Sequence, residues 1–463
     1  MIQLELKAYR RCSDRHVLVL ETNLTYVEKC QIFHYADLIR KAGNELTGIM
    51  KKRYDQLVRT KRYRKLKKLY KKYEDADNKK ALKDVCDQMK EMQKQYDVTW
   101  DYCRTSMIPI KKKYGIDAVF ALTKAEDVFR GIEKCLYSDG ETVHFKKRGD
   151  LPCIRAKQIN RGIIMKQMNF KFKNMEFGAR IKDRYEQEEV DAILYYLKNA
   201  EFMDSIAANT YKETNICIST YRPCYVSLVC KKIRGKLRVY VHITIEGVSK
   251  PKQDRFGNFK HNKGKGIVGC DIGTQTIAYT TETKAGLKNL AERGSSIEVN
   301  ERKERRIYRA MDRSRRAMNP DNYNEDGTIK KGKKKWTYSN RYKKLRTKHT
   351  ELCRINATNR HLAINEDVNE LRSLGDVFVT EPKNAKKLQK KAKTGKRKKR
   401  FGRSIKNRCP GYFQSQAKRK FRIYVEVPND YKASQYDHTS DTYIKKSLSQ
   451  RMYKLSDGTM VQR

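Results

Sequence analysis

Two acidic residues each follow a run of apolar residues, and acids in this position can bind a metal ion. The run GIVGC is typical of a strand buried in a sheet, and Asp271 follows it, with Gly273 and the strand-like run TIAYTT next. A second apolar run, 377–379, comes after a turn at Gly375 and ends in Glu381. Two neighbouring strands that each end in an acid can place those acids side by side. Clustered carboxylates commonly hold Mg²⁺ ions that activate water and stabilise the leaving oxygen in phosphodiester cleavage. The pattern predicts that Asp271 and Glu381 are catalytic residues and metal ligands.

Asp271 also has a purely structural interpretation. A buried unpaired carboxylate costs several kcal/mol, so this side chain is expected either in solvent or on a cation. An aspartate that caps a hairpin turn meets the first condition without a metal. The charge of the chain favours the nuclease interpretation, because 105 Lys and Arg against 54 Asp and Glu give a formal net charge of +51.

A net charge of +51 indicates a polyanionic partner, because it exceeds what solubility requires. An anionic membrane is one candidate, but it usually requires a basic amphipathic segment with a lipid anchor or a bulky apolar face, and we find none. No apolar run approaches the roughly 18 residues that span a bilayer, and the start MIQLELKAYRR lacks the apolar core of a signal peptide. We therefore expect nucleic acid as the partner, no membrane, and a cytoplasmic location.

The twelve cysteines form no Cys-x-x-Cys pair. The closest two, Cys224 and Cys230, lie inside one strand-like run, which suits neither a zinc ribbon nor a disulfide framework. We expect reduced, mostly buried small hydrophobic residues rather than metal ligands.

The elements that must position the acids follow from the periodicity of the chain. The first residues alternate as a half-buried strand does, and HVLVLET is expected to pair with them. Thr25 and Glu28 form a capping box that begins a helical region reaching about residue 138. CYVSLVCKKI and KLRVYVHITIE then form a hairpin through Arg234 and Gly235, as part of a small antiparallel barrel shared with the amino-terminal strands. A linker rich in Gly, Lys and Asn precedes the last domain, which begins near Gly266.

Several basic segments have two interpretations each. The helical run RTKRYRKLKKLYKKYEDADNKKALKDVCDQMKEMQKQY is either a solvated hairpin or a surface whose lysines and tyrosines contact a nucleic-acid backbone and bases. The segment that follows Glu381, as far as Cys409, holds fourteen Lys or Arg and no acid, and its position favours phosphate contact over a solvated tail. RKERRIYRAMDRSRR and RYKKLRTKHTELCR predict helices with a basic face.

The two acidic motifs together resemble a known family. GIVGCDIGTQTIAYTT is similar to the first RuvC motif, and DVFVTEPKNAKKLQKK to the second, of the TnpB family of transposon-encoded RNA-guided nucleases and the related miniature type V CRISPR effectors. The tail from FGRSIKNRCPGYFQSQ onward resembles the carboxyl-terminal segment of that family. The resemblance covers residues 266–463, and no motif before them is diagnostic.

The resemblance implies an α+β multidomain protein from a prokaryote. An RNase H-like (RuvC) α/β domain would bind two Mg²⁺ ions through an Asp, Glu, Asp triad, with Asp271 first and Glu381 second. A β-barrel wedge domain and a helical recognition lobe would hold a guide RNA paired with target double-stranded DNA. The expected segments are 1–24 for the first barrel strands, 25–139 for the helical lobe, 140–265 for the rest of the barrel and the linker, and 266–463 for the RuvC-like domain.

The sequence departs from the family pattern at three places. The family often carries a four-cysteine zinc knuckle where this chain has KASQYDHTSDTYIKKSLSQR, and His438 alone cannot build a zinc site, so no structural zinc is expected. The third aspartate is expected directly after MVQR, beyond Arg463. The helix-to-strand passage AKRKFRIYVEV lacks the expected Gly-bearing connection near Phe421. Either a carboxyl-terminal stretch is missing, which the passage near Phe421 supports, or the protein is a cleavage-deficient relative.

Three functions remain open on the sequence. The leading one is an RNA-guided DNA endonuclease with a RuvC site. The second is a guide-dependent DNA binder or repressor without cleavage, and the third is a transposase or resolvase that acts without RNA.

Overall fold

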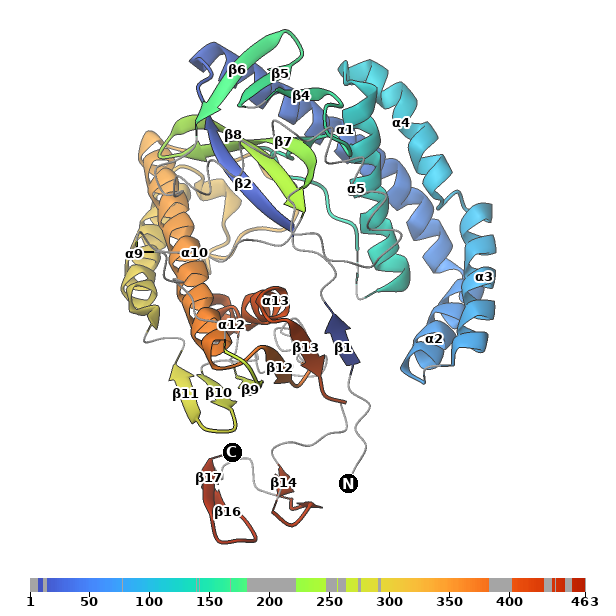
Figure 1. Cartoon of the computed structure of the whole chain (residues 1–463). Helices are drawn as coiled ribbons and strands as arrows, with labels where there is room; N and C mark the ends of the chain where they lie inside the picture. The colour runs from blue at the N-terminus through green and yellow to red at the C-terminus, as the bar shows by residue number, and fades with distance from the viewer. Residues whose placement is uncertain are drawn as a thin grey trace. The chain divides into compact units, whose positions relative to one another are not determined.

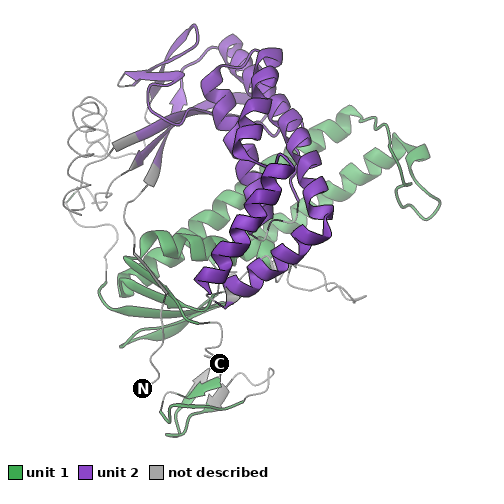
Figure 2. Ribbon diagram, turned by 90° about the vertical axis from the view of Figure 1, so that its right-hand side faces the viewer, with its two compact units in different colours: residues 1–12, 250–463 green, residues 13–249 purple. Residues whose placement is uncertain are grey.

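A computed structural model of the chain describes residues 7–10, 15–76, 78–138, 140, 142–166, 168–180, 222–246, 256, 264–273, 276–289, 293–382, 402–428, 435–437, 439–445 and 452–462. The chain divides into two compact units, residues 13–249 and residues 1–12 with 250–463 (Figure 2). Both units combine helices with a β-sheet, which agrees with the expected α+β multidomain class. Within the described residues, no helix combines the length and the apolar character that a membrane crossing requires.

The helical part of the unit 13–249 follows the predicted capping box. Its helices are α1 (Tyr26–Arg59), α2 (Lys61–Asp75), α3 (Lys79–Gln95), α4 (Trp100–Tyr114) and α5 (Ala118–Tyr137). The Thr25 hydroxyl accepts a hydrogen bond from the Glu28 backbone N–H at 3.3 Å, and the Glu28 carboxylate accepts one from the Thr25 N–H at 2.7 Å. The predicted helix start is therefore confirmed, because both unpaired N–H groups at this end are satisfied.

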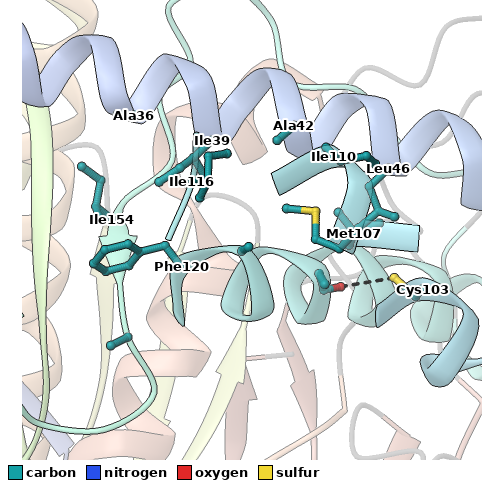
Figure 3. Packing of buried hydrophobic residues seen from close by; sticks show 14 of the residues in the cluster. Ala36, Ile39, Ala42, Leu46, Cys103, Met107, Ile110, Ile116, Phe120 and Ile154 are labelled. Atoms are coloured by element: carbon teal, nitrogen blue, oxygen red, sulfur yellow. Dashed lines mark hydrogen bonds between the residues drawn. The ribbon is translucent and has the colours of Figure 1, made fainter. Parts of the chain in front are cut away.

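These helices pack through apolar residues spaced at three and four positions. Ile39 and Leu46 of α1 lie with Met107 of α4 and Phe120 of α5 in one buried cluster (Figure 3). The Cys103 thiol donates to a backbone carbonyl of α5 at 3.6 Å, so this cysteine acts as a small core residue with a satisfied S–H. Burial of such aliphatic side chains stabilises the fold by about 1.5–3 kcal/mol each.

The sheet of the same unit has the strand order β3-β7-β8-β2-β6-β5-β4, and every pair is antiparallel. The strands are β2 (Arg15–Thr22), β3 (Ile154–Arg155), β4 (Ile163–Lys166), β5 (Asn169–Phe172), β6 (Met175–Arg180), β7 (Arg222–Ile233) and β8 (Lys236–Glu246). Arg234 and Gly235 join β7 to β8 with φ values of 50° and 78°, which matches the strand twist and confirms the predicted hairpin. Strand β2 pairs with β8, so the amino-terminal strand shares this sheet as predicted. No described residues pair β3 with β4, and barrel closure stays a prediction.

The second unit contains the sheet that carries both predicted acids. Its order is β1-β13-β12-β9-β10-β11, with β9, β12 and β13 parallel and the other pairs antiparallel. The strands are β1 (Lys7–Arg10), β9 (Ile267–Ile272), β10 (Thr276–Thr280), β11 (Ala285–Asn289), β12 (Val377–Thr380) and β13 (Ile423–Glu426). The helices are α9 (Ser295–Ala317), the 3₁₀ helix η1 (Pro320–Asn322), α10 (Asn340–Leu374), α12 (Gly402–Arg408) and α13 (Pro410–Lys420).

Helices α10 and α13 contribute to the core on one face of this sheet (Figure 1). Val268 of β9 and Phe378 of β12 pack there with Val368 of α10 and Phe413 of α13, all of them fully buried. The basic segments predicted to be helical lie within α9 and α10, which confirms both helices. Two short hairpins lie further along the chain, and they are formed by β14 (Tyr436–Asp437) with β15 (Thr442–Tyr443) and by β16 (Met452–Lys454) with β17 (Met460–Gln462).

The predicted first strand, residues 2–7, lies outside the described residues except for Lys7, and the strand described next to it does not pair with HVLVLET. Strand β1 pairs with β13 instead. The paired residues Arg10 and Ile423 are 413 positions apart in the sequence. Both sides of β2 are already taken by β8 and β6, whereas β13 needs a partner on its open edge. Consequently the units divide after residues 12 and 249, and the predicted segment 1–24 is shared between them.

The expected glycine connection before β13 is also not needed. Helix α13 ends at Lys420, and Phe421 turns the chain in an extended conformation with φ −78° and ψ 148°. Its side chain is buried, and the backbone N–H of Arg422 donates to the Asp376 carbonyl at 3.1 Å. This backbone conformation is open to any residue, so the passage from helix to strand does not require glycine.

The cysteines that the structure describes are all unpaired with one another. Cys103, Cys135 and Cys270 are buried, most of the others are half-buried, and Cys153 is exposed. The expectation of reduced thiols is met for these residues, but the expectation that most are buried is wrong.

Candidate functional site

The strand register brings the two predicted acids to neighbouring positions. Strands β9 and β12 are parallel, and the last registered pair is Cys270 with Thr380. In each strand the residue after this pair is the acid. Asp271 lies on β9, and Glu381 directly follows β12. Adjacent strands lie about 4.8 Å apart, so the two acids follow one another across the sheet.

Both acids lie on the sheet face opposite the core. In β9 the buried residues Val268, Cys270 and Ile272 alternate with residues on the other face, and Asp271 is exposed there. Glu381 is half-buried and continues the alternation of β12, in which Phe378 faces the core. Since side chains alternate along a strand, the sheet offers both carboxylates on one accessible face.

The backbone of Asp271 lies in a strand and not in the turn that follows it. Asp271 is the fifth residue of β9 and is paired with Ala278 of β10. The turn begins at Gly273, whose N–H donates to the Thr276 carbonyl at 2.9 Å. A Cβ on Gly273 would lie 2.6 Å from that carbonyl oxygen, so this tight turn requires glycine. Asp271 is thus held inside a paired strand, and a small side chain stands opposite it.

Thr380 links the two strands one residue before the acids. Its hydroxyl is buried and donates to the Cys270 carbonyl at 2.8 Å, while the Thr380 carbonyl accepts from the Val427 N–H at 3.0 Å. A hydrogen bond of this kind contributes about 1 kcal/mol net and costs more when one partner is left buried and unpaired. Thr380 therefore fixes the strand ends from which both carboxylates project.

Asp376 fixes the opposite ends of the same strands. Its carboxylate accepts from the Gly266 N–H at 3.2 Å and from Arg422 Nε at 2.5 Å, so one side chain joins the starts of β9, β12 and β13. The hydrogen bond from Arg422 holds the pKa of Asp376 below its usual range. Gly375 allows the close approach, because a Cβ there would lie 2.6 Å from the Gly266 carbonyl oxygen. The register of the acids is thus set at both ends of the strands.

The chemistry of the pair suits a hard divalent cation. Carboxylate oxygens are the ligands that Mg²⁺ prefers, and it is commonly bound through one or two of them together with water and substrate phosphate. The partial exposure of Asp271 and Glu381 leaves room for such further ligands. The residues present therefore fit a Mg²⁺ site, and a substrate with phosphate oxygens could complete it.

The acids nearer the carboxyl end are engaged in turns and hairpins. Asp437 lies in β14 and is fully buried, and its carboxylate accepts from the N–H and hydroxyl of Thr439 and of Ser456 at 2.6–3.0 Å. Asp441 accepts from the Tyr436 hydroxyl at 2.8 Å, and Asp457 accepts from a backbone N–H in its own turn. Among the described residues these carboxylates hold local structure, and Asp430 and His438 lie outside the described residues.

The network around Asp437 predicts a pH-dependent stability of the two short hairpins. Hydrogen bonds from Thr439 and Ser456 hold the pKa of Asp437 well below its usual range. A lowered folded-state pKa means that the stabilisation is present above the ordinary value of about 3.9 and is lost as the pH falls through the lower folded value. We expect the amides of Thr439 and Ser456 to lose protection from hydrogen exchange by about tenfold or more in Asp437→Asn at neutral pH. Unchanged protection of these amides in Asp437→Asn would contradict this role.

Helix α2 presents its charges to solvent and packs its tyrosine rings against the core. The exposed basic residues of α2 are Lys61, Arg62, Arg64, Lys65, Lys68, Lys71 and Lys72. In contrast, Tyr63 is fully buried, and Tyr70 and Tyr73 pack against the same core. The stacking interpretation is therefore wrong for Tyr63, whereas the exposed lysines and arginines remain available to phosphates. Most of the basic segment that follows Glu381, residues 383–401, lies outside the described residues.

The two acids were predictable from the sequence, but the residues that position them were not. Thr380, Asp376 and Arg422 act through contacts between residues 46 to 110 positions apart in sequence. The only local signal was Gly375 with Asp376 directly before an apolar strand. A cluster of three side chains on α9 and α10 was also not predicted from the sequence. Its members are Glu304, His349 and Cys353. The signal was the spacing of His349 and Cys353, four residues apart on one predicted helix.

Comparisons with known proteins give structural likenesses of low similarity. No protein-family model and no curated protein matches the chain. One similar solved structure is the "Cryo-EM structure of the Cas12f1-sgRNA-target DNA complex", at 10% identity and a TM-score of 0.35, covering 89% of this chain and 88% of that one. Another is the "Cryo-EM structure of CRISPR-Cas12f Ternary Complex", at 12% identity and a TM-score of 0.23, covering 84% of this chain and 70% of that one. Because both TM-scores lie below 0.5, neither likeness by itself establishes a shared fold.

Proposed function

We propose that this chain is an RNA-guided DNA endonuclease that cleaves through a RuvC-type site containing Asp271 and Glu381. The observation that carries the proposal is the parallel register of β9 and β12, which puts the two acids at neighbouring positions on an accessible sheet face. Phosphodiester hydrolysis is the chemistry that such a carboxylate pair supports in a strongly basic protein.

The order of the sheet supports an RNase H-like domain. Strands β9, β10 and β11 form an antiparallel meander, and β12 and β13 follow in parallel on the other side of β9. The first acid lies on the interior strand β9, and the second directly follows the neighbouring parallel strand β12, which is compatible with the RNase H-like domain that the motifs imply. Strand β1 is an addition at the edge.

Each part of the site has a separate role in the proposed reaction. Asp271 and Glu381 would hold Mg²⁺, which when bound supplies an activated water and charge stabilisation at the leaving oxygen. Thr380 and Asp376 hold the strand ends and thereby the spacing of the carboxylates. Pre-organised ligands avoid a reorganisation cost during the reaction, so rigid strands suit this task better than loops.

The proposal of a guide RNA and a target DNA is supported by the charge of the chain and by the resemblance of the two motifs. A net charge of +51 and the exposed basic faces of α2, α9 and α10 fit a backbone of phosphates read by shape. The motifs GIVGCDIGTQTIAYTT and DVFVTEPKNAKKLQKK resemble those of RNA-guided nucleases. Together they favour RNA-guided cleavage over nuclease activity without RNA.

A guide-dependent DNA binder without cleavage is the second candidate. It is favoured by the engagement of Asp437, Asp441 and Asp457 in local hydrogen bonds, which leaves these three acids as structural residues. A two-metal site depends on further oxygens beyond two carboxylates. Binding with no cleavage would therefore support this candidate.

The test is cleavage of a plasmid that carries the sequence paired by the guide. The protein purified with RNA from its own locus is expected to cut this plasmid in Mg²⁺ and to leave it intact after ribonuclease treatment or with an unpaired target. Binding without cutting would favour the second candidate, and cutting that survives removal of RNA would favour a transposase or resolvase. The three outcomes separate the three functions.

A further inference from the structure

A second cluster of metal-binding side chains lies between α9 and α10, on elements that the proposed nuclease chemistry does not use. Glu304 comes from α9, and His349 and Cys353 come from α10, four residues apart and therefore on one helix face. The two helices lie side by side in Figure 1. Glu304 and His349 are 19% and 25% exposed and Cys353 is half-buried, so an ion can reach the cluster while much of it is shielded.

The ligand atoms of the three side chains are already close together. The distance from His349 Nε2 to Glu304 Oε1 is 3.5 Å, from Cys353 Sγ to Glu304 Oε1 it is 3.7 Å, and from Cys353 Sγ to His349 Nε2 it is 3.8 Å. Without a metal these distances allow the Cys353 thiol to donate a weak hydrogen bond to the carboxylate. They also describe a nearly equilateral triangle of one oxygen, one nitrogen and one sulfur.

A tetrahedral zinc ion requires a triangle of this size. Zinc binds sulfur at about 2.3 Å and nitrogen or carboxylate oxygen at about 2.0–2.2 Å, which at a tetrahedral angle separates N and O by about 3.4 Å and S from either by about 3.6 Å. The three observed distances exceed these values by only one or two tenths of an ångström. Small side-chain movements are therefore enough to bring all three atoms onto one ion.

We propose that Glu304, His349 and Cys353 bind a zinc ion that joins α9 to α10, with water in the fourth position. The thiolate and the imidazole select a borderline-soft cation over Mg²⁺, which prefers oxygen ligands. The site is distinct from Asp271 and Glu381 in ligand chemistry, and it does not depend on the proposed function. It departs from the expectation of no structural zinc, which considered the cysteine-free segment near the carboxyl end.

Lys406 competes with the proposed ion for the same oxygen. Its Nζ lies 3.3 Å from Glu304 Oε1, and its side chain is 60% exposed. An exposed lysine gains little from such a pair and can turn to solvent when a divalent cation binds. Removal of the Lys406 charge is therefore expected to preserve or tighten zinc binding.

The experiment is a zinc titration of the chelator-treated protein by calorimetry, followed by the same titration with Co²⁺. We expect one Zn²⁺ per chain, and with Co²⁺ a near-ultraviolet thiolate-to-cobalt absorption band. Cys353→Ser is expected to lose the cobalt absorption band. His349→Ala and Glu304→Ala are expected to lose the one bound Zn²⁺ per chain. Cys86→Ser on α3 and His34→Ala on α1 are the matched controls and are expected to bind as wild type. Lys406→Gln is expected to bind zinc at least as tightly as wild type.

A measurement on the unmodified chain guards against variants that fail to fold. Bound zinc is expected to protect Cys353 from alkylation relative to Cys409, as read by mass spectrometry of the peptides. The proposal is overturned if wild-type protein binds no zinc, or if zinc binds but Cys353 is alkylated as fast as without it. None of these readouts uses nuclease activity, so failure of this site and failure of the proposed function are distinguishable.

Discussion

Asp271→Ala and Glu381→Ala are each expected to reduce guided, Mg²⁺-dependent cleavage by about a thousandfold or more, because metal ligands supply several kcal/mol of transition-state stabilisation. Target binding is expected to stay within about twofold of wild type, because the acids position ions rather than bases. The measurement is single-turnover cleavage beside a binding assay of the same target. A large effect is expected because Asp271 and Glu381 are at neighbouring positions in the register of β9 and β12. Loss of either one leaves the ion a single carboxylate of this pair.

Glu282→Ala is the matched control for this result. Glu282 is an exposed acid in the turn between β10 and β11 of the same sheet, so its removal changes the charge equally without touching β9 or β12. The isosteric variants Asp271→Asn and Glu381→Gln separate loss of charge from loss of shape. Cleavage near the wild-type rate in either alanine variant would show that other residues form the site.

The protein is expected to purify with one defined RNA, and its affinity for that RNA is expected to fall steeply with salt. A protein that neutralises 6–10 phosphates loses about 10³–10⁵ in affinity between about 50 and 200 mM salt, because bound counterions are released. The net charge of +51 and the exposed lysines and arginines of α2 predict a salt dependence of this size for the present chain. The measurements are sequencing of the co-purified RNA after expression beside the native locus, and the slope of log affinity against log salt.

A pair of triple variants tests whether α2 contacts the RNA. Lys65, Lys68 and Lys72 are exposed on α2, and replacing all three by alanine is expected to reduce the salt slope by about two to three. Replacing the exposed Lys83, Lys90 and Lys94 of α3 changes the net charge equally and serves as the control. Equal slopes in both variants would show that the effect is not specific to α2. Recovery of only heterogeneous RNA would contradict a guide.

Local elements could be predicted from the sequence because their causes are local. The capping box of Thr25 and Glu28 satisfies backbone groups three residues apart, and the two-residue turn at Arg234 and Gly235 is marked by glycine between two alternating runs. The strand runs that lead to Asp271 and Glu381 were visible for the same reason, because an unbroken apolar run next to an acid is a short-range pattern.

Pairing between distant segments could not be predicted from such patterns. The start of the chain was expected to pair with HVLVLET, and the pairing of the described strand β1 with β13 had no signal in the sequence, since any strand offers the same donors and acceptors and only the free edges of the folded sheets decide. The tyrosines of the basic helical region had two equal interpretations, and burial of Tyr63 in the core decided one of them.

The sequence by itself determined the charge of +51, the identity of the two acids and their place beside apolar strands, because composition and short-range periodicity carry that information. The tertiary structure alone decided that these acids are neighbours, through the parallel register of β9 and β12 and the contacts of Thr380 and Asp376. It alone decided that Glu304 meets His349 and Cys353, since that requires the packing of α9 on α10. Ligand distances depend on how elements pack in three dimensions, and that packing minimises the free energy of the whole chain rather than of any one segment.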